Sequence, residues 1–201
     1  MEETIAVQVP IAYGRRSKTR GNTYSSIVFD TAINMMGQAL VVPCVNQVRH
    51  LRDLILEATH LWTAELNGDN QFNEISAKWG CVALLPHPDR ELDGQIPESL
   101  LKGWATRVSR ERDHYETCAS VDSSGRLLID WPRKSNGEAL DLDLLLATAN
   151  FPERKMPTAN DIARAYWHND LTNLDYFTKN HKNGIKTAAD AKIMQELAKL
   201  F

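Results

Sequence analysis

The apolar residues of this chain change their spacing at Asn46. Before that point, residues 4–12 (TIAVQVPIA) alternate apolar with other side chains, which predicts a β-strand that Pro10 confines to a sheet edge or ends. From Asn46 to Leu66 the apolar residues recur every three or four positions, which predicts an amphipathic helix with Asn46 as its N-cap and Asn67-Gly68 as its stop. A sequence with both periods requires a fold that contains both sheet and helix.

Several further apolar segments are too short for helices and predict strands over 25–30, 38–43, 78–85, 126–131 and 139–147. The segment 78–85 is almost continuously apolar, which indicates a central strand buried on both faces. The last two segments flank a turn-rich loop that contains Asn136-Gly137, and we expect them to pair as a hairpin.

Capping and proline signals predict three more helices. Pro97 and Glu98 suit the first turn of one helix, because proline is pre-organised there and a carboxylate complements the helix dipole. Thr158 followed by Asp161 has the pattern of a capping box and opens a helix over 158–168. The last helix is expected to begin around Thr187 and to run to the C-terminus.

The order of these elements is not the strict alternation of a doubly wound fold. We therefore predict an α+β fold with a mainly antiparallel sheet and about four helices. The chain of 201 residues suits one compact domain with a small appendage. We expect an α+β domain over residues 1–150, with a basic arm at 13–24, and a helical extension over 151–201 packed on it.

The average composition excludes several classes of protein. A net charge of -3 and 43% hydrophobic residues argue against a uniformly basic nucleic-acid coat and against an acidic disordered tail. The longest apolar runs are four to six residues, whereas a membrane-spanning helix needs roughly 20. The N-terminus lacks a basic region followed by an apolar one, and the three cysteines lack CxxC spacing. We therefore predict a cytoplasmic protein with no membrane partner.

The charge is unevenly distributed, and the clearest feature is the basic arm, residues 13–24. It contains four cations within six positions, Arg15, Arg16, Lys18 and Arg20. No acidic residue lies between Glu3 and Asp30, so residues 4–29 carry +4 while the rest of the chain carries -7. A basic arm on an acidic body favours a partner bound in one orientation.

The arm has the composition of a phosphate-binding loop. Arginine guanidinium groups bind phosphate oxygens in a forked geometry, and neutral donors such as Asn22 add hydrogen bonds. Tyrosine rings at the two ends of the arm can stack on unpaired bases. The predicted nucleic-acid-binding residues are Tyr13, Arg15, Arg16, Lys18, Arg20, Asn22 and Tyr24. Together they predict a non-catalytic subunit of a larger bacterial-type nucleoprotein assembly that binds RNA or single-stranded DNA alongside other protein subunits.

Two other interpretations of the arm remain open. It is also the composition of a solvated hairpin loop that keeps edge strands soluble. Alternatively, it docks on an acidic protein, as in an interaction module such as a phage- or plasmid-encoded inhibitor. The arm matches neither the Walker A spacing nor GxGxxG, so a nucleotide-cradling loop is disfavoured.

A metal-dependent nuclease is a third hypothesis for the chain. Asp130, Asp141 and Asp143 lie on the predicted hairpin, where carboxylates could hold Mg²⁺. This arrangement superficially resembles the acidic hairpin of the PD-(D/E)xK nucleases. Leu145 stands where that motif has lysine, and without the lysine a polar outer face of the hairpin is the favoured interpretation.

Histidines and cysteines offer weaker candidates. The six histidines form no HxH, HxxxH or HExxH pattern, so neither a zinc site nor a cofactor is predicted. Cys44 and Cys81 have apolar flanks and are expected to be buried. Cys118, near His114 on a possible strand, is the better candidate for a partly exposed nucleophile.

Overall fold

The protein folds into two compact units, each built from separate stretches of the chain. The computed structural model describes residues 4–17, 23–32, 35–44, 47–66, 68, 73–168 and 174–200. The first unit contains residues 42–131 and 139–151, and the second contains residues 3–41, 132–138 and 152–201. Both units combine helices with antiparallel strands, which confirms the predicted α+β class.

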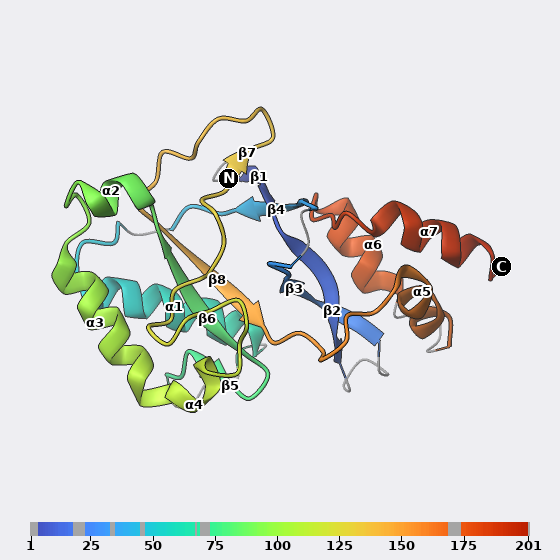
Figure 1. The fold of residues 1–201 in the computed structure, drawn as a ribbon, viewed down its shortest axis with the longest axis horizontal. Helices are drawn as coiled ribbons and strands as arrows, with labels where there is room; N and C mark the ends of the chain where they lie inside the picture. Colours follow the sequence, from blue (N-terminus) through green and yellow to red (C-terminus); the bar gives the residue numbers. More distant parts are fainter. Residues whose placement is uncertain are drawn as a thin grey trace. The chain divides into compact units, whose positions relative to one another are not determined.

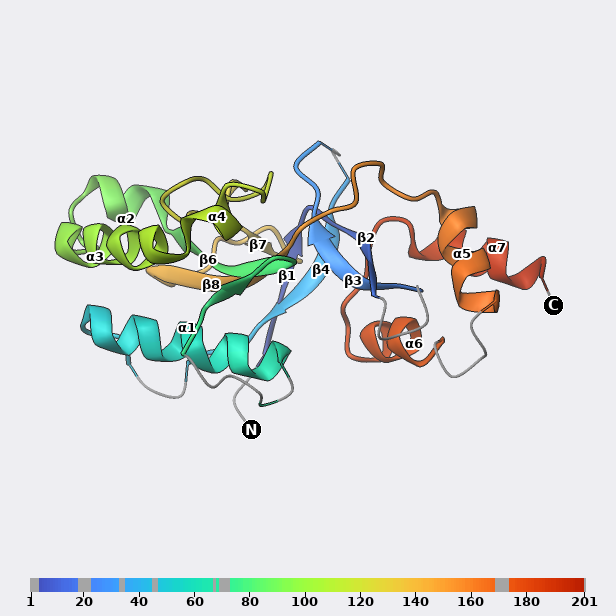
Figure 2. The same ribbon diagram turned by 90° about the horizontal axis from the view of Figure 1, so that it is seen from below.

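A three-stranded antiparallel sheet forms the centre of the first unit, in the order β5 (Ser76–Ala77), β6 (Gly80–Pro86) and β8 (Leu144–Asn150). The register runs from Gly80 opposite Asn150 to Pro86 opposite Leu144. All seven residues of β6 are buried. This confirms the sequence-based expectation of a central apolar strand, because β6 lies between β5 and β8 and helices cover both of its faces (Figure 2).

Helices cover both faces of this sheet (Figure 2). One face packs on α1 (Leu51–Glu65), and the other faces α2 (Pro88–Leu92), α3 (Glu98–Val108) and α4 (Arg112–Tyr115), with a short 3₁₀ turn, Ser109–Glu111, between the last two. The ring of Trp62 stacks on that of Trp79 at 4.6 Å. The Tyr115 hydroxyl donates to the Val82 carbonyl at 2.8 Å, so buried aromatic residues join helices to strands.

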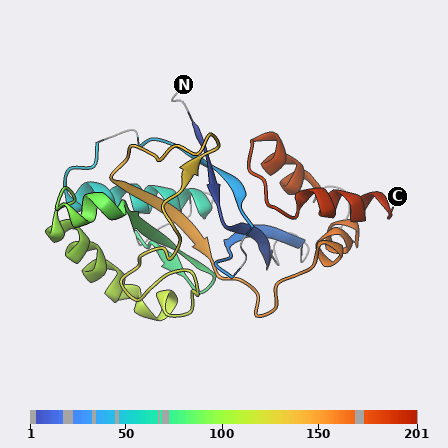
Figure 3. The same cartoon turned by 45° about the horizontal axis from the view of Figure 1, so that its top comes forward.

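Two small sheets form the strand part of the second unit. The first has the order β4 (Gly37–Val41), β1 (Ile5–Val9) and β7 (Arg133–Lys134), all antiparallel, and Figure 3 shows β7 beside β1. The second is a hairpin of β2 (Ile11–Ser17) and β3 (Thr23–Phe29). Pro10 separates β1 from β2, as expected for a residue that cannot donate to a sheet ladder.

Three helices complete the second unit: α5 (Ala159–His168), α6 (Leu174–Lys182) and α7 (Asp190–Ala198). Their buried faces form one apolar cluster with the β2–β3 hairpin. Its members include Tyr166 from α5, Phe177 from α6 and Ile193 from α7, together with Tyr13 and Tyr24 from the hairpin. Distant parts of the sequence therefore share one core.

A local capping signal located helix α5 correctly. The Asp161 amide donates to the Thr158 hydroxyl at 3.2 Å, and the Thr158 amide donates to the Asp161 carboxylate at 2.9 Å. This is the predicted capping box of α5. Helix α1 begins at Leu51, where the Asp53 carboxylate accepts the His50 amide hydrogen at 2.9 Å. The prediction of Asn46 as the N-cap of this helix is wrong, because the N-cap is His50.

The predicted hairpin over 126–131 and 139–147 is wrong. Arg126 and Leu127 form only isolated bridges, with Leu84 and Val121. The second segment forms β8 only from Leu144 onward, and its antiparallel partner is β6. The apolar residues 144–147 do form a strand, as predicted. Their hydrogen-bonding partner is β6, which is more distant in sequence and more apolar than residues 126–131.

The predicted boundary near residue 150 falls close to the point where the second unit resumes at Pro152. The helices beyond that point belong to one unit with residues 3–41, which the sequence-based division had assigned to the domain over 1–150. Helix α5 packs against β3 within that unit. Helices α2, α4 and α6 were not predicted, because α2 and α4 are short and α6 has a largely polar sequence, LDYFTKNHK.

Candidate nucleic-acid interface

The described residues of the basic arm, 13–17 and 23–24, belong to an irregular part of the β2–β3 hairpin. Tyr13 lies opposite Ile27, Arg15 opposite Ser26 and Ser17 opposite Thr23, so the register shifts twice within five residues. Such bulges bend a strand and change the face on which a side chain emerges. Arg15 is half-buried and Arg16 is exposed, so the two adjacent arginines have different environments.

The rings of Tyr13 and Tyr24 lie in the core and not on the arm's surface. Tyr13 is 2% exposed and Tyr24 is 6% exposed. Asn180 donates its side-chain amide to the Tyr13 hydroxyl at 3.3 Å, and burial raises the pKa of Tyr13 well above its usual value. These rings hold the hairpin against α5 and α6, which leaves little of either ring for stacking on a base.

Arg16 contacts both the hairpin and the segment before α5. Its guanidinium carbon lies 4.8 Å from the centroid of the Tyr24 ring, within the range of a cation–π interaction. Its backbone amide donates to the Glu153 carboxylate at 3.3 Å. The Glu153 amide in turn donates to the Gly14 carbonyl at 2.9 Å, so this segment runs along β2.

Gly14 allows this close approach. A Cβ atom at this position would lie 2.4 Å from Val28 Cγ2 and 2.8 Å from Met156 Cε. Both distances are shorter than van der Waals contact, so only glycine fits without displacing a neighbour. The second glycine of the arm, Gly21, lies outside the described residues, as do Lys18, Arg20 and Asn22.

The structure adds two cations that sequence reasoning did not assign to the arm. Arg154 and Lys155 are exposed and follow directly after Glu153, which is bonded to β2. Lys155 and Arg16 both lower the pKa of the Asp161 carboxyl, after the larger effect of its hydrogen bonds from Thr158. Arg16 and Lys155 therefore both lie near Asp161, although they are far apart in sequence.

Two of the three carboxylates of the nuclease hypothesis are bound to an arginine. Arg90 of α2 forms ion pairs with both Asp141 and Asp143. These hydrogen bonds, that to Asp143 first, raise the pKa of Arg90 further. Asp130 is exposed. No group of three or more histidine, cysteine or acidic side chains within the described ranges could hold a metal ion.

The environments of Cys44 and Cys118 differ from those expected, whereas Cys81 is buried as predicted. Cys44 is exposed, whereas Cys81 and Cys118 are buried. A hydrogen bond from Cys81 lowers the pKa of Cys118 to about 6, and Ser120 at 3.3 Å adds to this effect. The same contact, with burial, raises the pKa of Cys81. Cys118 is therefore acidic but enclosed, which argues against a role as a nucleophile.

His114 lies on α4 and not on the strand that the sequence suggested. Its Nδ1 is 2.9 Å from the Ser76 hydroxyl, which donates to the Glu111 carboxylate at 2.5 Å. In a nucleophilic triad the serine would donate to the histidine and be reachable by substrate. Ser76 is fully buried and donates to the acid, so this cluster is structural.

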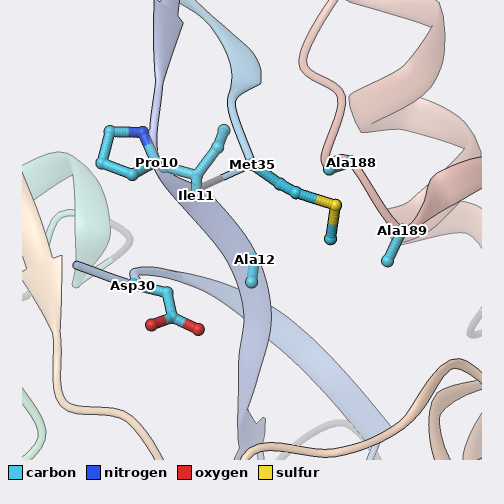
Figure 4. A pocket seen from close by; sticks show the side chains of 7 residues that line it. All are labelled: Pro10, Ile11, Ala12, Asp30, Met35, Ala188 and Ala189. Atoms are coloured by element: carbon cyan, nitrogen blue, oxygen red, sulfur yellow. The ribbon is translucent and has the colours of Figure 1, made fainter. Parts of the chain in front are cut away.

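A small hollow in the second unit is lined by Pro10, Ile11, Ala12, Asp30, Met35, Ala188 and Ala189 (Figure 4). The Met35 side chain extends toward Ala188 and Ala189. The hollow has a volume of about 40 Å³. It admits water but not an organic substrate, because ligand sites usually measure about 300–1,000 Å³.

Comparison with models of known families, with curated proteins and with solved structures finds no match to this chain. No helix in the described part of the chain is both long enough and apolar enough to cross a bilayer. The candidate function therefore has to be argued from the side chains and their surroundings.

Proposed function

We propose that this protein is a non-catalytic nucleic-acid-binding subunit that binds RNA or single-stranded DNA through the basic arm. The observation that supports this best is the addition of Arg154 and Lys155 beside the base of the arm. Together with Arg15, Arg16, Lys18 and Arg20, they make two cationic segments that can contact successive phosphates.

Tyr13 and Tyr24 are buried, which argues against base stacking on these two rings as a binding mechanism. Binding would depend on phosphate contacts, and the two rings would fix the hairpin that presents the cations. Such binding is sensitive to salt and weakly selective for sequence, because phosphate contacts carry no sequence information directly. This suits a subunit that holds a strand within a cytoplasmic assembly of several proteins.

The carboxylate near Arg16 modulates this surface. Glu153 accepts a backbone hydrogen bond at the base of the arm, so its charge partly offsets the neighbouring cations. The negative charge of Glu153 would also repel a phosphate group that approaches the neighbouring cations. Replacing Glu153 should therefore strengthen binding, whereas a solvated loop without a ligand would show no such effect.

The test compares the wild type with an arm variant, R15A/R16A/K18A/R20A, by titration of fluorescein-labelled single-stranded RNA and DNA. A matched variant, K78A/R112A/K192A/K199A, removes the same charge from exposed positions outside the arm. We expect the arm variant to lower the slope of log affinity against log salt by about 3, because each single-strand phosphate contact contributes about 0.7. The matched variant should bind like the wild type.

No binding by the wild type at low salt, or equal binding by the arm variant, would refute this proposal. Capture of an acidic protein that persists after nuclease treatment and is lost in the arm variant would instead favour the protein-interaction module. The absorbance ratio at 260 and 280 nm after purification in low salt gives an independent check on co-purified nucleic acid.

A further inference from the structure

A groove between α1 and α3 in the first unit has a strongly basic lining. Its volume is about 480 Å³, which lies within the usual range of about 300–1,000 Å³ for ligand sites. The lining residues are Leu51, Arg52, Ile55, Gly103, Thr106, Arg107 and Arg110. Three of these seven are arginines and none is acidic.

The helical period explains how the groove forms. Leu51 and Ile55 are one turn apart on α1, and Gly103, Thr106 and Arg110 follow at three- and four-residue steps, so each helix contributes one face. A Cβ atom on Gly103 would lie 2.4 Å from Leu51 Cδ2. The helices therefore approach closely at Gly103, and the longer side chains on either side enclose the groove.

The arginines of the groove differ in how far they are already neutralised. Arg107 forms an ion pair with Glu111 and donates to the Asn73 carbonyl at 3.0 Å. Arg52 and Arg110 are exposed, and the side chain of neither forms a hydrogen bond or ion pair with another described residue. Two guanidinium groups thus retain their hydrogen-bonding capacity at the edge of the groove.

Asp53, which follows Arg52 on α1, does not neutralise the Arg52 guanidinium through a hydrogen bond. The Asp53 carboxylate accepts the backbone amides of Arg49 and His50, at 3.0 and 2.9 Å. These hydrogen bonds, with a smaller contribution from the charge of Arg52, lower the pKa of Asp53. The carboxylate is therefore committed to the start of α1, and the groove keeps a net positive lining.

We propose that this groove binds the phosphodiester backbone of a single-stranded nucleic acid. Arg52 and Arg110 bind phosphate oxygens, because the planar guanidinium fork matches phosphate geometry. Leu51 and Ile55 contact the apolar faces of sugars or bases. The inference rests on the proposed function, and it places a second contact in the first unit, separate from the arm of the second unit.

A second contact also accounts for a weakness of the arm alone. Its four cations would give modest, salt-sensitive affinity. Two more phosphate contacts from Arg52 and Arg110 raise the expected salt slope by about 1.4, since each contributes about 0.7 for single strands. The groove is open to solvent at Arg52, Thr106 and Arg110, so a polymer can pass through it.

The test uses the full chain and two variants of equal charge. R52A/R110A removes the groove cations, and K78A/R112A removes two exposed cations of the same unit that do not line the groove. Fluorescein-labelled single-stranded RNA and DNA are titrated at several salt concentrations, and thermal melting verifies that each variant is folded. We expect R52A/R110A to lower the slope by about 1.4, and K78A/R112A to leave it unchanged.

A photo-crosslinking experiment locates the contact directly. Thr106 is exposed and lines the groove, so a benzophenone side chain placed there should crosslink to the bound strand. The same side chain at Leu92, an exposed residue of α2 in the same unit, is the control and should not crosslink.

The outcomes separate this inference from the proposed function. If the arm variant loses binding while R52A/R110A keeps the wild-type slope and position 106 does not crosslink, the groove proposal is overturned and the arm stands. If the wild type binds neither oligonucleotide, both fail. If labelled poly-glutamate binds to the wild type and not to R52A/R110A, while oligonucleotide binding is unchanged, the groove recognises acidic protein and the proposal is overturned.

Discussion

The guanidinium of Arg16 covers the ring of Tyr24, with its carbon 4.8 Å from the ring centroid. Tyr24 is 6% exposed and belongs to the apolar cluster of the second unit. One side chain is thus both a candidate phosphate ligand and part of the cover of a core tyrosine. Stability and binding are therefore linked at this position.

Replacing Arg16 should separate these two roles. We expect R16A to lower the free energy of unfolding by about 0.5–1 kcal/mol, the usual value of a cation–π contact, and to lower the salt slope of RNA binding by about 0.7. R16K should keep the slope, because its charge remains. Urea denaturation and oligonucleotide titration measure the two effects, and an unchanged slope in R16A would remove Arg16 from the binding surface.

The capping box of α5 should make the free energy of unfolding depend on pH. The dependence should appear in the acidic range, below the usual pKa of an aspartate side chain. Hydrogen bonds from Thr158 lower the pKa of Asp161 below its reference value of 3.8. The carboxylate therefore contributes its stabilisation fully above pH 3.8 and loses it as the pH falls through the lower folded value. D161N should lose this dependence.

The same cap can be tested at neutral pH. T158A removes the hydroxyl that bonds Asp161 in both directions, and we expect it to cost about 1 kcal/mol of unfolding free energy. T106A serves as the control, since the Thr106 hydroxyl donates only to a carbonyl within α3, at 2.9 Å. Equal melting curves for T158A and the wild type would contradict the capping role.

Gly14 should tolerate no larger residue unless Val28 is also reduced. A Cβ atom at Gly14 would lie 2.4 Å from Val28 Cγ2, and Val28 is 1% exposed. We expect G14A to cost about 1–3 kcal/mol through overpacking. In G14A/V28A the combined cost should be smaller than the two single costs together, as measured by a double-mutant cycle. Additive costs would contradict the contact.

The three cysteines should react in a defined order. Cys44 is exposed and should react with iodoacetamide in the native protein, while Cys81 and Cys118 are buried and should react only after unfolding. The hydrogen bond from Cys81 lowers the pKa of Cys118, but burial keeps the Cys118 sulfur from the reagent. Mass spectrometry of the alkylated peptides gives the order, and early labelling of Cys118 would contradict this arrangement.

Elements with strong local signals could be predicted from the sequence. The periodicity of α1, the proline before α3 and the Thr158–Asp161 pair of α5 each act within a few residues. The continuous apolar run of β6 reports burial on both faces. Such features do not depend on the rest of the fold, so sequence patterns located them within a few residues.

Features that depend on distant segments could not be predicted. Tyr13 is buried against Phe177 and Asn180 of α6. The residues next to Tyr13 in the sequence do not indicate these distant contacts. Arg90 binds Asp141 and Asp143 across some fifty residues of sequence. The alternation of aspartate and leucine around Asp143 suggested an exposed acidic face of a strand. In the structure the Arg90 guanidinium neutralises these carboxylates.

The two units have a consequence for the order in which the protein can fold during synthesis. After residue 3 the chain passes from one unit to the other following residues 41, 131, 138 and 151. Every residue needed by the first unit's sheet and helices has been made once Phe151 emerges. Strands β1 to β4 are made first, yet the apolar cluster that encloses β2 and β3 waits for α5 to α7. During synthesis the apolar residues of the β2–β3 hairpin therefore remain exposed until α5 to α7 have been made. Other molecules can contact the hairpin during this time.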